Sequence, residues 1–69
     1  MTEPINHTEP RYRLDQQLLT PSQAAQLLAV RTSWIYEAVR THRLPCLRIG
    51  RHIRFTQHML ERWLEDQAA

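Results

Sequence analysis

Lysine is absent from this chain of 69 residues, and glycine and cysteine each occur only once. Without lysine, every side chain with a fixed positive charge is an arginine, whose planar guanidinium suits bidentate contacts with phosphate and guanine. A biased genomic base composition would equally explain the absence of lysine. The single cysteine, and the lack of a charged-then-apolar leader or an apolar run of about 18 residues, predict a reduced, soluble, cytoplasmic protein with no membrane partner.

Residues suited to catalysis are also scarce. No serine is placed as a nucleophile beside a base, no pair of carboxylates lies in an apolar context, and no glycine-rich loop could cradle a phosphate. Cys46 with His42 is the nearest approach to a metal or thiol site, but one cysteine and scattered histidines lack zinc-ligand spacing. We therefore expect no enzyme activity, no metal and no cofactor, with Cys46 buried and inert.

The length and the charge distribution indicate the kind of partner. A chain of this size forms one small domain that buries roughly 60% of its unfolded surface, which leaves little room for a catalytic cleft. The net charge is only +2, but the stretch from Arg31 to Arg62 holds seven arginines against two acids, Glu37 and Glu61. This asymmetry predicts that the middle of the chain meets a polyanion.

The first part of the chain differs in composition from the rest. Residues 1–17 are rich in proline and polar residues, repeat Thr-Glu-Pro at Thr2 and Thr8, and contain almost nothing to bury. We predict a disordered N-terminal arm over 1–17 and a folded domain over 18–67. Arg11 and Arg13 could touch a phosphate, but a solvated tail is the simpler interpretation.

Two short helices are predicted at the start of the folded domain. Thr20-Pro21-Ser22-Gln23 has the form of a capping box, with proline at the first helical position. The predicted buried face of this two-turn helix comprises Ala24, Ala25, Leu27 and Leu28. A second helix is predicted from about Thr32 to Thr41. It is expected to end before Leu44, because Pro45 disfavours helical geometry at that residue. Its inward face is predicted to hold Ile35, Ala38 and Val39, and its outward face Ser33, Tyr36, Glu37 and Arg40.

A last helix is predicted after Thr56, which can act as its cap. Met59, Leu60, Trp63 and Leu64 recur there at helical spacing and are expected to face the core. Glu61, Arg62, Glu65 and Asp66 are expected to point outward. Trp63 is most simply a core residue, and Trp34 in the second helix is expected to pack partially, or to contact another protein if it is exposed.

The segment between the second and last helices is predicted to be a basic hairpin around Gly50. Leu47, Ile49, Ile53 and Phe55 share one parity, and Arg48, His52 and Arg54 share the other, as in a half-buried strand pair. A two-residue loop would pair Ile49 with His52 and mix apolar and basic groups on each face. A three-residue loop over 50–52 would pair Ile49 with Ile53, so the pattern favours the three-residue loop.

A basic hairpin behind two helices is the arrangement that a winged helix-turn-helix protein presents to DNA. In such proteins the outward face of the second helix enters the major groove. We therefore predict two sets of DNA-binding residues. Those of the recognition helix are Arg31, Thr32, Ser33, Tyr36, Glu37 and Arg40. Those of the wing and its flanks are Arg43, Arg48, Arg51, His52 and Arg54. The simpler alternative for the recognition helix is an ordinary solvated helix face.

The sequence resembles that of a known family. The residues that carry the resemblance are Leu18-Leu19-Thr20, Ala24-Ala25-Gln26-Leu27-Leu28, Val30, Ile35-Tyr36, Arg40, Leu44-Pro45, Arg48-Ile49-Gly50-Arg51, Ile53-Arg54 and Leu60-Glu61-Arg62-Trp63-Leu64. From Leu18 to Glu65 the chain is similar to the excisionase-type DNA-binding domain of the MerR superfamily. The resemblance implies a mostly helical fold with three short helices and a two-stranded wing. It also implies a second helix in the major groove and a wing along the adjacent minor groove or backbone.

Three positions depart from the family pattern. The family commonly has glycine at the position of Ala29, a serine cap at that of Arg31, and glycine or asparagine near His42. Arg31 leaves the amides of the second helix without a cap, at a cost of about 1 kcal/mol, unless Thr32 takes over. An arginine there also adds a cation where DNA would lie, so this departure fits binding better than stability.

Many members of the family are excisionases of phages or integrative elements, also called recombination directionality factors, which bind beside an integrase site, bend the DNA and favour excision. The chain is accordingly predicted to be a non-enzymatic, sequence-specific protein that binds double-stranded DNA, associates with the nucleoid and acts with a phage-type integrase and neighbouring copies of itself. A small AlpA-like transcription regulator is the alternative. A protein-interaction adaptor using Trp34 and the acidic last helix would instead show no salt-sensitive DNA binding.

Overall fold

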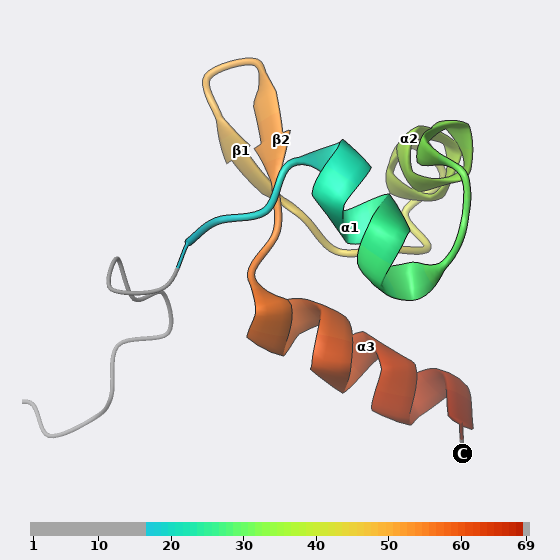
Figure 1. Ribbon diagram of the computed structural model, residues 1–69. Helices are drawn as coiled ribbons and strands as arrows, with labels where there is room; N and C mark the ends of the chain where they lie inside the picture. The colour runs from blue at the N-terminus through green and yellow to red at the C-terminus, as the bar shows by residue number, and fades with distance from the viewer. Residues whose placement is uncertain (1–16, 69) are drawn as a thin grey trace, which may run out of the picture.

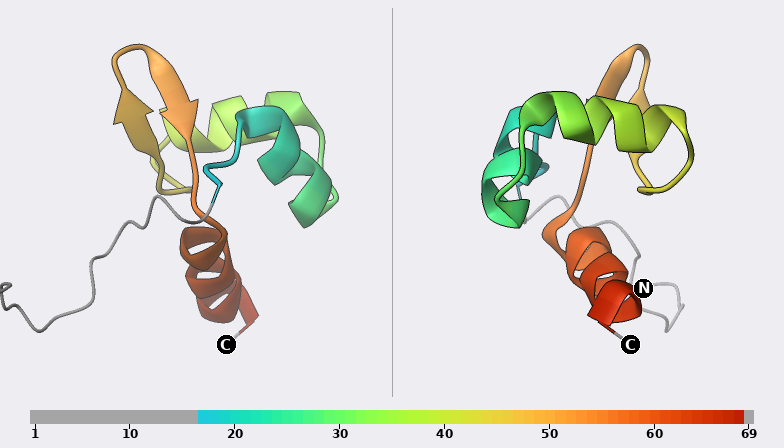
Figure 2. Two further views of the ribbon diagram at one scale, coloured as in Figure 1. Left: turned by 60° about the vertical axis from the view of Figure 1, so that its left-hand side comes forward. Right: turned by 90° about the vertical axis from the view of Figure 1, so that its right-hand side faces the viewer.

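The computed structural model describes residues 17–68 and contains three helices and one two-stranded antiparallel sheet. The elements, in chain order, are α1 (Pro21–Leu28), α2 (Thr32–Arg40), β1 (Leu47–Ile49), β2 (His52–Arg54) and α3 (Gln57–Ala68) (Figure 1). The hairpin projects beyond α1 and α2 at one end of the domain, and α3 lies at the other end (Figure 2). This arrangement confirms the predicted mostly helical, winged helix-turn-helix fold. The predicted N-terminal arm lies outside the described residues, apart from Gln17.

α1 begins with the predicted capping box. The backbone N–H of Gln23 donates to the Thr20 hydroxyl at 3.1 Å, and the backbone N–H of Thr20 donates to the side-chain Oε1 of Gln23 at 2.9 Å. The helix ends at Ala29, whose φ of 59° lies in the left-handed region, and the amide of Val30 then donates to the Ala25 carbonyl at 3.0 Å. A residue with a Cβ is strained by about 1–2 kcal/mol in this conformation, which explains why glycine suits the position.

α2 ends in a similar way. Its C-cap is Thr41, and His42 then takes a φ of 61°. The amide of Arg43 reaches back to the Ala38 carbonyl at 2.7 Å, and the His42 amide donates to the Val39 carbonyl at 3.0 Å. These bonds satisfy helix-end carbonyls that have no partner inside the helix.

The core lies where the three helices meet the base of the hairpin. Phe55 and Ile35 are its largest fully buried side chains. The other buried apolar residues are Ala24, Ala25, Ala38, Val39, Leu44 and Leu60. Phe55 also exchanges two backbone hydrogen bonds, of 2.7 and 2.9 Å, with Leu19, which ties the start of the domain to the end of the hairpin. Trp63, predicted as a core residue, is only partly buried and packs at the edge of this core.

Two leucines predicted on buried faces are exposed instead. Leu27 is 58% exposed and Leu64 is 46% exposed. At 100° per residue, Leu27 lies about 110° from the centre of the α1 stripe formed by Pro21, Ala24, Ala25 and Leu28, and Leu64 lies roughly 90° from the centre of the α3 stripe. Each helix packs on one side only, so a residue at the margin of an apolar stripe remains in solvent.

The predicted register of the hairpin is wrong. Ile49 pairs with His52 and Arg48 with Ile53, so the loop is the two-residue Gly50-Arg51. Gly50 has a φ of 60°, while Arg51 is not among the residues with positive φ, which is the pattern of a type II′ turn with glycine at its first central position. Turn geometry therefore decided the register, at the expense of a uniformly apolar face.

Within residues 17–68, no helix is both long enough and apolar enough to span a membrane.

Candidate nucleic-acid interface

The outward face of α2 is polar, aromatic and basic, as predicted. Ile35, Ala38 and Val39 are buried, while Ser33, Tyr36, Glu37 and Arg40 are exposed, with Tyr36 51% accessible. The inward residues recur at spacings of three and four and hold one side of α2 against the core, which leaves the opposite side free to meet another molecule. Thr32 is only partly exposed at the first helical position.

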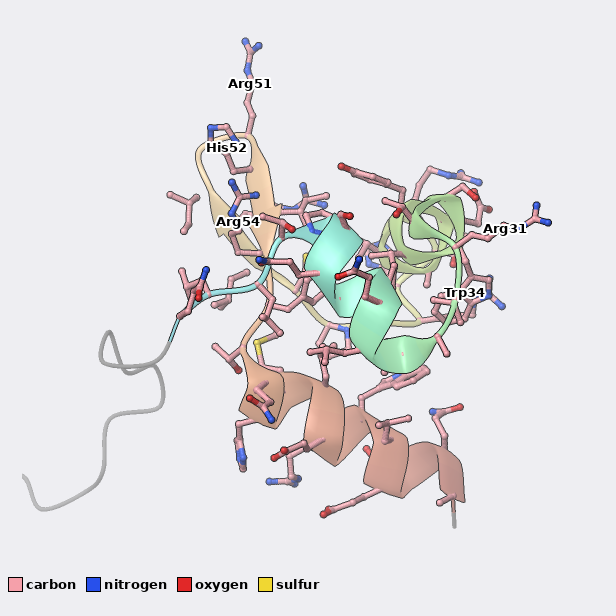
Figure 3. The ribbon with its side chains drawn as sticks, in the orientation of Figure 1. Arg31, Trp34, Arg51, His52 and Arg54 are labelled. Atoms are coloured by element: carbon pink, nitrogen blue, oxygen red, sulfur yellow. The ribbon has the colours of Figure 1, made fainter. Side chains whose placement is uncertain are left out.

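Arg31 is the N-cap residue of α2, and its side chain makes no capping hydrogen bond. Thr32 does not replace it as cap, because the helix begins at Thr32 itself. The Arg31 side chain extends away from the body of the domain (Figure 3). This cation therefore takes no part in holding the helix end and is positioned at the margin of the α2 face.

Arg40 carries an intramolecular partner on the same face. Its guanidinium lies 2.5 Å from the Glu37 carboxylate, and both side chains are largely exposed. An exposed ion pair of this kind contributes no more than about 1 kcal/mol, because water screens both charges. A phosphate could compete with Glu37 for Arg40, and Glu37 at the same time limits the positive charge of the α2 face.

The turn after α2 is tied to α3. Trp63 Nε1 donates a hydrogen bond of 2.8 Å to the carbonyl of Arg43, and the Trp63 ring meets Trp34 edge to face with centroids 6.1 Å apart. Trp34 is thus partly buried against the core rather than displayed to solvent. The hypothesis of a protein-interaction adaptor required Trp34 to be exposed, so the position of Trp34 argues against it.

The wing carries its cations on different faces, contrary to the prediction of one basic face and one apolar face. Residues directly opposite each other in an antiparallel pair share a face, so Arg48 shares a face with Ile53, which packs on the core. His52 and Arg54 lie on the other face, beside Leu47 and the half-exposed Ile49. Arg51 extends from the tip, away from the rest of the domain (Figure 3).

The predicted site residues therefore fall into three groups. Arg31, Ser33, Tyr36, Glu37 and Arg40 lie along the exposed side of α2 or at its start, with Thr32 partly covered. Arg43 in the turn after α2 and Arg48 in β1 of the wing line one cleft together with His42. Arg51, His52 and Arg54 lie at the tip and on the far face of the wing. Sequence reasoning did not place His42 in this set, although its departure from the family's glycine or asparagine was a visible signal.

The prediction that Cys46 is buried is only partly right. Cys46 is half-buried, packs against the core and lines the same cleft. Among residues 17–68, no group of three histidine, cysteine or acidic side chains is placed to hold a metal ion.

The fold and the exposed faces define a winged helix-turn-helix DNA-binding domain. A family model described as a helix-turn-helix domain matches residues 18–68, which is most of the chain, and the protein belongs to this family. No curated protein and no solved structure matches the chain significantly. Double-stranded DNA is accordingly the partner that the family indicates.

Proposed function

We propose that this protein is an excisionase, a small factor of a phage or integrative element that binds specific DNA sites beside an integrase site and bends the DNA. The observation that carries this proposal is the pairing of an exposed, hydrogen-bonding α2 face with an adjacent arginine-tipped wing in one family-matched domain. On this proposal, α2 reads base edges in the major groove, and the wing follows the adjacent minor groove or backbone.

The division of labour follows from the side chains. Ser33 and Arg31 can reach base edges, where a good bidentate contact discriminates by roughly 1–3 kcal/mol. Arg51 and Arg54 are suited to phosphates or to a narrow minor groove, whose negative potential attracts arginine regardless of sequence. Affinity would then come mainly from the wing and specificity mainly from α2.

One domain of this size covers too little DNA for high specificity, since a single module buries on the order of 600–1,000 Å². We therefore propose that several copies, or one copy and an integrase, bind side by side. The contact surface proposed for the neighbour is the exposed side of α3, where Leu64 lies beside Glu61 and Glu65. Arginines of an adjacent molecule would meet acids there. Trp34 is no longer a candidate for this contact, because it packs against Trp63.

Solution measurements test the assembly. Sites selected from random duplexes would be used to compare binding to one-site and two-site DNA, with sedimentation of the free protein and a fluorescence measurement of DNA bending. The expected result is a free monomer that fills adjacent sites cooperatively and bends them. A stable free dimer, or independent filling of the two sites, would contradict the assembly.

The excisionase role needs its own experiment. A reporter flanked by the two hybrid attachment sites of the element that encodes the protein would be incubated with the cognate integrase, with and without the protein. Excision that depends on the protein supports the role. Specific DNA binding with no effect on excision, but with a change in transcription from a promoter near the site, would identify an AlpA-like regulator instead.

A further inference from the structure

The surface between the end of α2 and the start of β1 is hollowed into a cleft with a volume of about 350 Å³. Its polar lining comes from three basic residues, His42, Arg43 and Arg48, and Val39, Leu44 and Pro45 contribute apolar walls. None of the residues that line it is acidic. We propose that this cleft seats one backbone phosphate of DNA, held by His42, Arg43 and Arg48 together.

The position of the cleft supplies the first argument, and it rests on the proposed placement of α2 and the wing. Adjacent major and minor grooves of a duplex are separated by one sugar–phosphate strand. If α2 occupies the major groove and the wing occupies the neighbouring minor groove, that strand must pass between them. The cleft is lined by the end of α2, the turn that follows it and Arg48 of β1, which shares a face of the wing with Ile53, so on this placement the strand would pass over it.

Electrostatics supply the second argument. A helix C-terminus repels anions through its unpaired carbonyls, yet here the carbonyls of Glu37, Ala38 and Val39 already accept bonds from the amides of the following turn. Arg43 is partly oriented, because its Nε donates to the Thr41 hydroxyl at 3.1 Å. The remaining donors of its guanidinium can serve an anion in the fork geometry that suits phosphate.

The backbone of His42 supplies the third argument. Its φ of 61° is a conformation that glycine or asparagine adopts with less strain, yet the chain carries an imidazole there, lining the cleft. A neutral imidazole can donate one hydrogen bond and a protonated one can donate two, and a phosphate oxygen accepts either. On this proposal, a hydrogen bond from the imidazole to phosphate offsets the strain of the position.

The only cysteine of the chain makes the cleft testable without a substitution. Cys46 lines the cleft and is partly exposed, so a strand seated there would shield its thiol. The experiment measures the rate at which a maleimide labels Cys46 with and without duplex DNA, while fluorescence anisotropy reports the bound fraction in the same sample. With free duplex at about 100 times its Kd, the rate should fall up to about a hundredfold, since only unbound protein reacts.

The matched control moves the thiol to the far end of the domain. Gln67→Cys in a Cys46→Ser background places the thiol near the exposed C-terminal end of α3, where a bound duplex with a single site should leave the labelling rate unchanged. If Cys46 reacts at its free rate while anisotropy shows the duplex bound, the cleft proposal is overturned and DNA binding stands. Absence of any duplex binding would overturn the proposed function and the cleft together.

Inorganic phosphate separates two sources of the same chemistry. At an ionic strength matched with chloride, phosphate alone should protect Cys46 far less than the duplex does. Equal protection would assign the cleft to a free anion and overturn its assignment to a DNA strand.

Two substitutions test the basic residues directly. Arg48→Ala should flatten the dependence of log affinity on log salt by about one, as expected for one lost phosphate contact, whereas Arg62→Ala on α3 should not. His42→Asn keeps a residue that tolerates the left-handed conformation and should lower affinity for all sequences severalfold. Unchanged salt dependence with Arg48→Ala and unchanged affinity with His42→Asn would remove the cleft from the interface.

Discussion

The indole nitrogen of Trp63 in α3 donates a hydrogen bond of 2.8 Å to the backbone carbonyl of Arg43, 20 residues earlier in the chain. The same ring lies edge to face with Trp34, which belongs to the first turn of α2. One side chain of α3 therefore contacts the first turn of α2 and the turn that follows the helix. Because α2 carries the exposed face proposed to read DNA, Trp63 holds that helix in place from the side opposite the DNA.

Replacement of Trp63 by phenylalanine tests this contact. Trp63→Phe keeps an aromatic ring near Trp34 but removes the donor to the Arg43 carbonyl, which remains open to water. The free energy of unfolding should fall by about 1 kcal/mol, and Trp63→Ala should cost more because it also removes the ring pair. Urea denaturation followed by circular dichroism measures both. Equal stability of Trp63→Phe and the natural chain would show that water replaces the bond without loss.

The left-handed residue after α1 predicts a stabilising substitution. Ala29→Gly should raise the free energy of unfolding by about 0.5–1 kcal/mol, since relief of strain at φ 59° exceeds the extra entropy of glycine in the unfolded chain. Gln26→Gly, at an exposed position inside α1, is the control and should destabilise by about 1 kcal/mol. A loss of stability with Ala29→Gly would contradict the assignment of strain to Ala29.

Substitution of Arg31 should change stability and DNA affinity in opposite directions. Arg31→Ser supplies the missing cap of α2 and should stabilise the domain by about 1 kcal/mol, while it removes a cation from the proposed interface. Specific affinity should therefore fall although the protein becomes more stable. Thermal denaturation and anisotropy titrations on selected and random duplexes provide the two readouts.

Ser33→Ala is the companion variant, because it should relax base preference without adding a cap. If specific and random DNA lose affinity equally with both variants, Arg31 and Ser33 position the DNA backbone and do not read bases.

The wing tip predicts a change in salt dependence. Arg51→Ala should weaken binding to all sequences and flatten the slope of log affinity against log salt by roughly one, because one phosphate contact no longer releases a counterion. Titrations at several salt concentrations measure the slope. Its persistence at the natural value would exclude Arg51 from the interface.

Local features of the sequence were sufficient for much of the fold. The capping box of Thr20 and Gln23, the inward row of Ile35, Ala38 and Val39, and the cap at Thr56 were all predicted and are present. These features depend on residues three or four positions apart, which contact each other in any helix. The resemblance, with glycine expected at Ala29 and glycine or asparagine near His42, also pointed to the two non-glycine residues with positive φ, because φ is a local property of the chain.

The register of the wing could not be obtained from the alternation of apolar and basic residues. That pattern assigns faces within each strand, but the relative shift of two three-residue strands depends on the turn, and the Gly50-Arg51 loop chose the shift that mixes them. The Gly-Arg dipeptide was itself a signal for a two-residue loop. The prediction of a three-residue loop gave more weight to the separation of apolar and basic residues onto different faces, and it was wrong.

The sequence alone determined where the helices begin, which side of α2 is buried and that arginines gather in the middle of the chain. Only the tertiary structure decided that Leu27 and Leu64 remain in solvent, that Trp63 reaches the Arg43 carbonyl and that His42, Arg43 and Arg48 line one cleft. The first group depends on interactions between near neighbours in the chain. The second depends on how whole elements pack, and no short stretch of sequence specifies which margin of a helix, or which edge of a hairpin, another element will cover.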